Sequence, residues 1–251
     1  MNISEQLNHR KIILESFWIK FLLLILVLFL ISILIGQTMP QENTFASTTH
    51  EKLLQKIKLP SPNLESKTSI EYALNKRRSI RNYKEEPISL QEASQLLWAA
   101  QGVTSPDGAR TTPSAGALYP LEIYLVSKKI DGLSEGVFQY NPSDHSLSKI
   151  SNGDKLNTLC AAALSQESVK EAPAIIVITA VFSRTTSKYG ERGKRYVYME
   201  AGHAAQNIYL QAVSEEIGTV TVGAFSDSEV SKILSLAKNE VPIYLIPLGK
   251  N

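Results

Sequence analysis

Residues 174–181 read Ala-Ile-Ile-Val-Ile-Thr-Ala-Val, a run that is apolar apart from Thr179. An apolar run of this length, without polar residues at alternate positions, is typical of a central strand that is covered on both faces of its sheet. Further strands are expected at 122–127, 219–222 and 242–247. Residues 137–140 and 146–150 form a predicted hairpin across the turn residues Asn-Pro-Ser-Asp.

Helix-start signals lie between these strands. Thr68–Glu71 and Ser89–Glu92 both fit the capping-box pattern, and further helices are expected from Asp154 to about 164 and after Ser226. The longest helix should run from about 195 to 217. Helices and strands mix without a regular βα alternation, so the sequence predicts an α+β fold with helices packed around a mostly antiparallel central sheet.

The composition is that of a folded chain, with 43% hydrophobic and 20% charged residues. A net charge of +2 gives no reason to expect nucleic acid binding. The single cysteine, Cys160, lies among apolar residues and is expected to be a buried, inert thiol. No dinucleotide fingerprint, phosphate loop or zinc motif is present, and Glu200 with His203 is a lone i, i+3 pair, so no metal site is expected.

The N-terminal part contains a second apolar run, Phe21–Ile35, which Phe17, Trp18 and Ile19 extend. At about 1.5 Å per residue the extended run approaches the roughly 30 Å of a bilayer core. A single-pass membrane localisation is therefore expected, with a cytoplasmic N-terminus at 1–16, a transmembrane anchor at 17–36, a tether at 37–56 and a folded domain at 57–251. A cleaved secretory signal is the competing interpretation, and the side of the membrane on which the domain lies stays open.

Two short runs carry the chemistry. Arg77–Arg81 packs three arginines and a serine into five residues, and planar guanidinium groups suit a phosphate. Pro113–Gly116 is a small-residue turn whose backbone amides can approach a ligand. Together they indicate a phosphorylated cofactor, although an arginine cluster in isolation is more often a solvated face.

From about residue 57 to the C-terminus the chain resembles the FMN-dependent nitroreductase superfamily and, within it, the SagB/ThcOx-type dehydrogenases. The motifs that carry this resemblance occur in the family's order. They are Arg77–Tyr83, Pro113–Pro120, Lys188–Gly193, Ala201–Asn207 and Val222–Phe225.

The resemblance implies a homodimer with FMN at its interface. Arg77, Ser79 and Arg81 would bind the phosphate and ribityl chain, and Arg78 would approach the pyrimidine end of the ring. Pro113, Ser114, Ala115 and Gly116 would come from the other subunit and cover the flavin. The remaining expected contacts are Val222, Gly223 and Ala224 along the isoalloxazine edge and Lys250 at the phosphate.

Lys188 and Tyr189 match the pair that acts as acid and base in azoline-oxidising relatives, and dehydrogenation needs a proton acceptor where hydride leaves. The other interpretation of this pair is a solvated surface loop. The expected function is an FMN-dependent oxidoreductase of the SagB/ThcOx type, acting on a small molecule or a peptide, with azoline-to-azole oxidation as the family's known chemistry. An NAD(P)H-dependent nitro or quinone reductase and a non-catalytic flavin-binding module are the alternatives.

Overall fold

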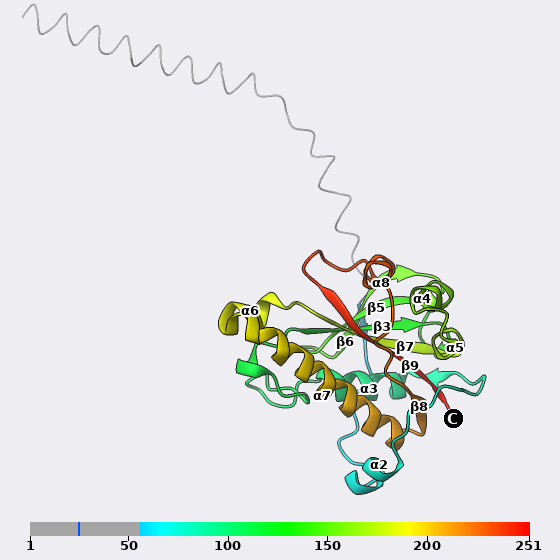
Figure 1. Cartoon of the computed structure of the whole chain (residues 1–251). Helices are drawn as coiled ribbons and strands as arrows, with labels where there is room; N and C mark the ends of the chain where they lie inside the picture. Colours follow the sequence, from blue (N-terminus) through cyan, green and yellow to red (C-terminus); the bar gives the residue numbers. More distant parts are fainter. Residues whose placement is uncertain (1–24, 26–55) are drawn as a thin grey trace, which may run out of the picture. The chain divides into compact units, whose positions relative to one another are not determined.

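The computed structural model describes Ile25 and residues 56–251 (Figure 1). Its centre is a seven-stranded sheet in the order β1-β6-β5-β3-β7-β9-β8, and every pairing within it is antiparallel. A separate parallel pair is formed by β2 and β4. The predicted α+β fold with an antiparallel central sheet is confirmed. The strands are β1 (Lys56–Lys58), β2 (Ile88–Ser89), β3 (Leu121–Ser127), β4 (Ile130–Asp131), β5 (Gly136–Asn141), β6 (Ser146–Asn152), β7 (Ala174–Ala180), β8 (Ile217–Thr219) and β9 (Val241–Lys250).

Helices cover both faces of this sheet (Figure 1). They are α2 (Ile70–Lys76), α3 (Leu90–Gln101), α4 (Leu156–Ala162), α5 (Glu167–Glu171), α6 (Ser183–Tyr189), α7 (Gly193–Ser214) and α8 (Asp227–Leu234), with short 3₁₀ turns η1 (Ala115–Ala117) and η2 (Gly190–Arg192).

The position of β7 between two layers of helices explains why its sequence lacks alternating polar residues. Ile176 and Ile178 face a core shared with α3 and α7, whereas Ile175 and Val177 face a second core formed with α4, α5 and α8. All seven residues of β7 are buried. A strand between two helical layers must be apolar on both sides, so the sequence pattern and the three-layer arrangement agree.

Several predicted boundaries need correction. The first predicted capping box is wrong, because Ser69 rather than Thr68 caps α2, accepting a hydrogen bond from the Tyr72 amide at 3.1 Å, and the third helical residue is then Tyr72 instead of Glu71. The box at Ser89 is confirmed. The longest helix ends at Ser214, before Ile217, because Glu216 turns to a φ of 55° and Ile217 then pairs with Lys250 in the sheet.

The predicted membrane localisation also needs correction. Within Ile25 and residues 56–251, no helix is both long and apolar enough to cross a bilayer. The helix α7 has 22 residues but carries Lys194, Arg195 and Glu200. The predicted N-terminus, anchor and tether at 1–16, 17–36 and 37–56 lie outside the described residues, apart from Ile25 and Lys56.

A half-buried histidine links the start of the described domain to its core. The imidazole of His145 lies 2.7 Å from the Ser94 hydroxyl, 2.9 Å from the Pro60 carbonyl and 2.8 Å from the Tyr140 hydroxyl. The Ser94 hydroxyl also donates to the Pro60 carbonyl at 2.7 Å. Burial lowers the pKa of His145, which favours the neutral form of the ring.

We expect His145→Ala to lower the free energy of unfolding by about 2–4 kcal/mol, because it leaves the buried Tyr140 hydroxyl without a partner and removes the ring that packs edge-on against Tyr140. Chemical denaturation measures this loss. Tyr140→Phe is the matched comparison, since it removes one hydroxyl and keeps the ring, and it should cost less than half as much. A loss below about 0.5 kcal/mol for His145→Ala would contradict the role assigned to the network.

Candidate active site

The arginine run begins where α2 ends. Arg77 is the C-cap residue of α2, and its guanidinium lies 5.3 Å from the centre of the Tyr209 ring. Two residues on, the Ser79 hydroxyl lies 3.2 Å from the Tyr209 hydroxyl. The amide of Ile80 donates to the Thr219 carbonyl at 2.9 Å, which holds the run against β8. Arg81 is exposed. Alternate residues of the run thus approach Tyr209, on the last third of α7.

Tyr209 connects this run to the segment that follows β8. Its hydroxyl accepts a hydrogen bond from the Thr221 amide at 2.9 Å and lies 3.4 Å from the Thr221 hydroxyl. Burial alone would raise the pKa of Tyr209, but the hydrogen bonds from Ser79 and Thr221 and the charge of Arg77 outweigh burial and lower it. We call Arg77, Ser79, Tyr209 and Thr221 the Tyr209 cluster.

Residues 222–224 continue from the Tyr209 cluster along an open surface. Val222 is buried and exchanges two backbone hydrogen bonds with Leu245, at 2.8 and 3.0 Å, whereas Gly223 and Ala224 are exposed. A Cβ atom at Gly223 would meet only the Tyr244 ring, at 3.7 Å, which is an ordinary contact. Packing within this chain therefore does not require the glycine, and its surface is free for a flat ligand to lie against.

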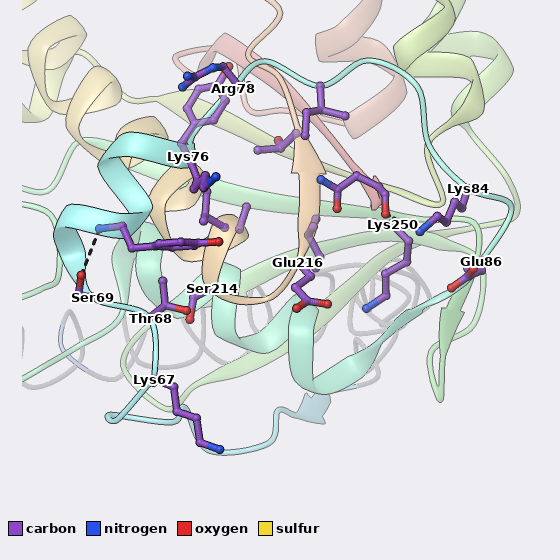
Figure 2. A pocket seen from close by; sticks show the side chains of 18 residues that line it. Lys67, Thr68, Ser69, Lys76, Arg78, Lys84, Glu86, Ser214, Glu216 and Lys250 are labelled. Atoms are coloured by element: carbon purple, nitrogen blue, oxygen red, sulfur yellow. Dashed lines mark hydrogen bonds between the residues drawn. The ribbon is translucent and has the colours of Figure 1, made fainter.

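Arg78 and Lys250 line a cavity of about 1020 Å³ beside α2 (Figure 2), and Tyr209 lines the same cavity. Arg77, Ser79 and Arg81 do not contribute to it. Arg78 donates to the carbonyls of Asn75 and Arg77, at 3.0 and 2.7 Å, and Lys250 is ion-paired with Glu92. The charged residues that line the cavity are Lys67, Lys76, Arg78, Lys84, Lys250, Glu86 and Glu216.

The small-residue loop lies elsewhere and contacts the Lys188–Tyr189 pair. Gly116 has a φ of 66°, and a Cβ atom there would meet the Tyr189 hydroxyl at 2.8 Å and the Lys188 ammonium at 3.1 Å. Only a glycine fits this approach without displacing either group. The structure thus brings together two motifs that lie about 70 residues apart in the sequence. We call Ser114, Gly116, Lys188 and Tyr189 the Tyr189 cluster.

Lys188 and Tyr189 form the end of α6 rather than a loop, and Lys188 is exposed whereas Tyr189 is half-buried. Gly190, with a φ of 57°, ends the helix. The Tyr189 ring packs edge-on against Tyr196 of α7, with ring centres 5.2 Å apart, and the Lys188 ammonium lies 5.5 Å from the centre of the Tyr189 ring. These contacts hold both side chains beside Gly116.

The two clusters lie toward opposite ends of α7. Tyr189 packs on Tyr196, which is 13 residues before Tyr209 and therefore about 20 Å from it along a helix at ~1.5 Å per residue. Figure 1 shows α6 beside the start of α7, with α2 and β8 near its end. Within a single chain, the arginine run and the Pro113–Gly116 loop therefore lie apart.

Sequence reasoning missed Tyr209 and Thr221 as members of these sites. A tyrosine or threonine in an apolar segment looks like a core residue, and nothing in the local pattern of Tyr209 distinguishes it. Among the described residues, no group of three or more His, Cys, Asp or Glu side chains gathers as a metal-binding set.

A model of the nitroreductase family matches residues 74–250. The chain belongs to the nitroreductase family. The resemblance seen in the motifs is confirmed, and the protein is an oxidoreductase of a family whose members are generally flavin-dependent.

Individual nitroreductase-family relatives cover most of the described domain. A Methanocaldococcus jannaschii protein named as a nitroreductase is 45% identical over 194 residues, which is 77% of this chain and 96% of that protein. The Escherichia coli microcin B17-processing protein McbC is 28% identical over 80% of this chain and 79% of its own length.

Solved structures agree. A nitroreductase from Anabaena variabilis has a TM-score of 0.71 at 28% identity and matches 79% of this chain, although the match spans only 42% of that longer chain. A chain of the E. coli microcin synthetase McbBCD complex, solved with truncated pro-microcin bound, has a TM-score of 0.61 at 25% identity, over 86% of this chain and 85% of its own.

Proposed function

We propose that this protein is a homodimeric, FMN-dependent dehydrogenase of the SagB/ThcOx type, with each flavin held between subunits. The observation that carries the proposal is the separation of the two clusters toward opposite ends of α7. A second copy with its α7 antiparallel to the first would place the Tyr189 cluster of one subunit beside the Tyr209 cluster of the other. Each complete site would then need both chains.

The Tyr209 cluster fits the phosphate and ribityl end of FMN. Arg77 supplies permanent charge and directed donors, and Ser79 supplies a hydroxyl. The exposed Arg81, which follows in the same run, would add a second guanidinium. Arg78 and Lys250 would serve the pyrimidine edge and the phosphate by analogy with the family, although both face the cavity of Figure 2. The exposed Gly223 and Ala224, next to Val222, offer a flat surface for the ring.

The outer face of α7 fits a second copy of the chain. Tyr198 and Met199 are 56% and 57% exposed, and a Cβ atom at Gly202 would find nothing within 4 Å. Large apolar side chains beside an open glycine suit close packing of another helix. On α2, which packs against α7, Ile70 and Leu74 are also more than half exposed.

Lys188 and Tyr189 are the proposed acid and base. Bound FMN would supply the hydride acceptor, and oxidation of a carbon–nitrogen or carbon–carbon bond also requires that a proton leave the substrate. Gly116 brings the Pro113–Gly116 loop into contact with both side chains, so the flavin-covering loop and the proton acceptor belong to one subunit. Both would act on a flavin whose phosphate is bound by the other.

Two substrate classes have specific support. The likeness to McbC favours oxidation of azolines in a peptide to azoles. The 45% identity to the M. jannaschii nitroreductase favours the alternative, reduction of nitro compounds or quinones by NAD(P)H. Anaerobic mixing with NADH or NADPH separates them, because only the reductase should bleach the flavin within a catalytic turnover. A flavin that no donor or substrate reduces would indicate a non-catalytic module.

We expect the purified protein to be yellow, dimeric and to bind one FMN per subunit. Charge-assisted hydrogen bonds contribute about 1.5–3 kcal/mol each, so Arg77→Ala should weaken FMN binding about ten- to a hundredfold. Flavin fluorescence titration and light scattering measure these properties. Lys238→Ala is the control, because Lys238 lies outside both clusters. A colourless monomer that takes up no FMN would refute the proposal.

A further inference from the structure

An arginine on α6 joins three parts of the chain. One guanidinium nitrogen of Arg184 donates to the Tyr119 carbonyl at 2.9 Å, and another lies 2.5 Å from the carboxylate of Glu122 on β3. Glu122 also accepts a hydrogen bond from the Gln139 side chain of β5 at 3.2 Å. The rigid fork of a guanidinium holds two acceptors in fixed directions, so Arg184 fixes α6 relative to the loop that precedes β3.

The Tyr119 carbonyl is a group that needs a partner outside its own loop. Tyr119 has a φ of 43° and precedes Pro120, and a residue before proline is normally extended, so this conformation persists only where the surroundings impose it. Because proline has no N–H group, the Tyr119 carbonyl is the only polar group of the peptide bond between them. Arg184 binds that carbonyl, and the Val181 amide donates to the Pro120 carbonyl at 2.8 Å. The start of α6 and the residues before it therefore hold both carbonyls.

The same loop presents Gly116. The Tyr119 amide donates to the Ser114 hydroxyl at 2.9 Å, and the Ala117 amide donates to the Ser114 carbonyl at 3.0 Å. These two bonds close the chain around Gly116, which lies between their ends. The conformation of Tyr119 is thus linked directly to the position of Gly116.

The helix α6 and this loop meet at two places. A Cβ atom at Gly116 would lie 2.8 Å from the Tyr189 hydroxyl and 3.1 Å from the Lys188 ammonium, and Arg184, one helical turn before Lys188, holds Tyr119. We propose that Arg184 is a positioning residue that keeps the loop of residues 114–119 on α6, and so keeps Gly116 beside the Lys188–Tyr189 pair. The positioning concerns a single chain, while its effect on turnover rests on the function proposed above.

The backbone contact distinguishes Arg184 from an ordinary ion pair at the surface, which often contributes little. The side chain of Arg184 is 42% exposed and that of Glu122 is 19% exposed. If the bond to the Tyr119 carbonyl is the important one, the charge of Glu122 should matter less than the guanidinium itself. Glu122→Gln keeps an oxygen acceptor for Arg184, so it should disturb the loop less than Arg184→Ala does.

Hydrogen exchange of the flavin-free protein tests the positioning directly. Arg184→Ala should speed exchange of the Ala117 and Tyr119 amides at least about tenfold, while the amides of β7 exchange as slowly as in the wild type. Arg184→Lys keeps the charge but has one nitrogen in place of the fork, so it should give a smaller increase. Lys232→Ala is the matched control, because it removes a helix cation that is ion-paired with Glu229 on α8. Unchanged exchange in Arg184→Ala or, if that variant does not fold, in Arg184→Lys would overturn the proposal.

Single-turnover reduction of the bound flavin by substrate, at saturating FMN, tests the consequence. Misplacing a reacting group by about 1 Å can slow a reaction about a hundredfold, so Arg184→Ala should slow this step at least about fivefold. If Arg184 acts through the pair, adding Arg184→Ala to a chain that already carries Lys188→Ala and Tyr189→Phe should slow it by less than about twofold more.

Two losses that multiply would show that Arg184 acts independently of the pair, and would contradict its role in positioning Gly116 beside Lys188 and Tyr189. A wild-type protein that binds no FMN refutes the proposed function instead, and the exchange experiment then decides the role of Arg184.

Discussion

Tyr189→Phe and Lys188→Ala are expected to abolish most substrate turnover while leaving the bound flavin and the dimer intact. A positioned acid or base contributes about 10²–10⁴ in rate, so the loss should be at least tenfold for either variant. Single-turnover reduction of the bound flavin by substrate, followed by its absorbance, measures the step in which the proton and the hydride leave.

The neighbouring Tyr196→Phe is the matched control for Tyr189→Phe. Tyr196 packs against the Tyr189 ring but is not in the contact with Gly116, so its hydroxyl should be dispensable for turnover. If Tyr189→Phe and Lys188→Ala both turn over substrate at the wild-type rate, the base lies elsewhere. Loss of flavin from either variant would instead assign the end of α6 a structural role.

The second large effect is expected from mixing two inactive chains. Arg77→Ala removes a phosphate ligand from the Tyr209 cluster, and Lys188→Ala with Tyr189→Phe removes the proton-handling pair from the Tyr189 cluster. In a symmetric dimer whose sites each use one cluster from each chain, a mixed dimer contains one intact site and one doubly defective site.

Random mixing of equal amounts makes about half of the dimers mixed, so about one quarter of wild-type activity should return from two parents that are nearly inactive. Co-expression of differently tagged chains, at FMN concentrations that leave the Arg77→Ala site empty, provides the material. A mixture no more active than the mean of its parents would show that both clusters serve the same flavin within one chain.

Local sequence patterns were sufficient to predict the main strands and helices of the fold. The apolar run at 174–180 marks the central strand because both faces of β7 are covered, and the turn at Asn141–Asp144 joins β5 to β6 as expected. The short helices α5 and α6 were missed because each has fewer than eight residues and neither begins with a side chain that caps it.

The candidate site was less predictable, for a physical reason. The contact of Gly116 with Lys188 and Tyr189 depends on how α6 packs on α7, which no local pattern contains. The role of Tyr209 likewise depends on its meeting Ser79 across 130 residues of sequence. Glu200, which the sequence offered only as half of an i, i+3 pair with His203, is a buried residue of α7, and its burial depends on the packing of that helix.

The two edges of the central sheet have a consequence for how copies of this protein avoid aggregation. An uncovered edge strand offers unpaired backbone groups to any passing strand. Here β1 is only three residues long and carries Lys56 and Lys58, both in contact with Asp144. A strand that paired with this edge would have to remove water from these charged side chains. At the other edge, β8 is also three residues long, and its Thr219 carbonyl already accepts a hydrogen bond from the Ile80 amide. Strand-to-strand growth is therefore discouraged at both edges, and the helical surfaces remain as the places where another chain can associate productively.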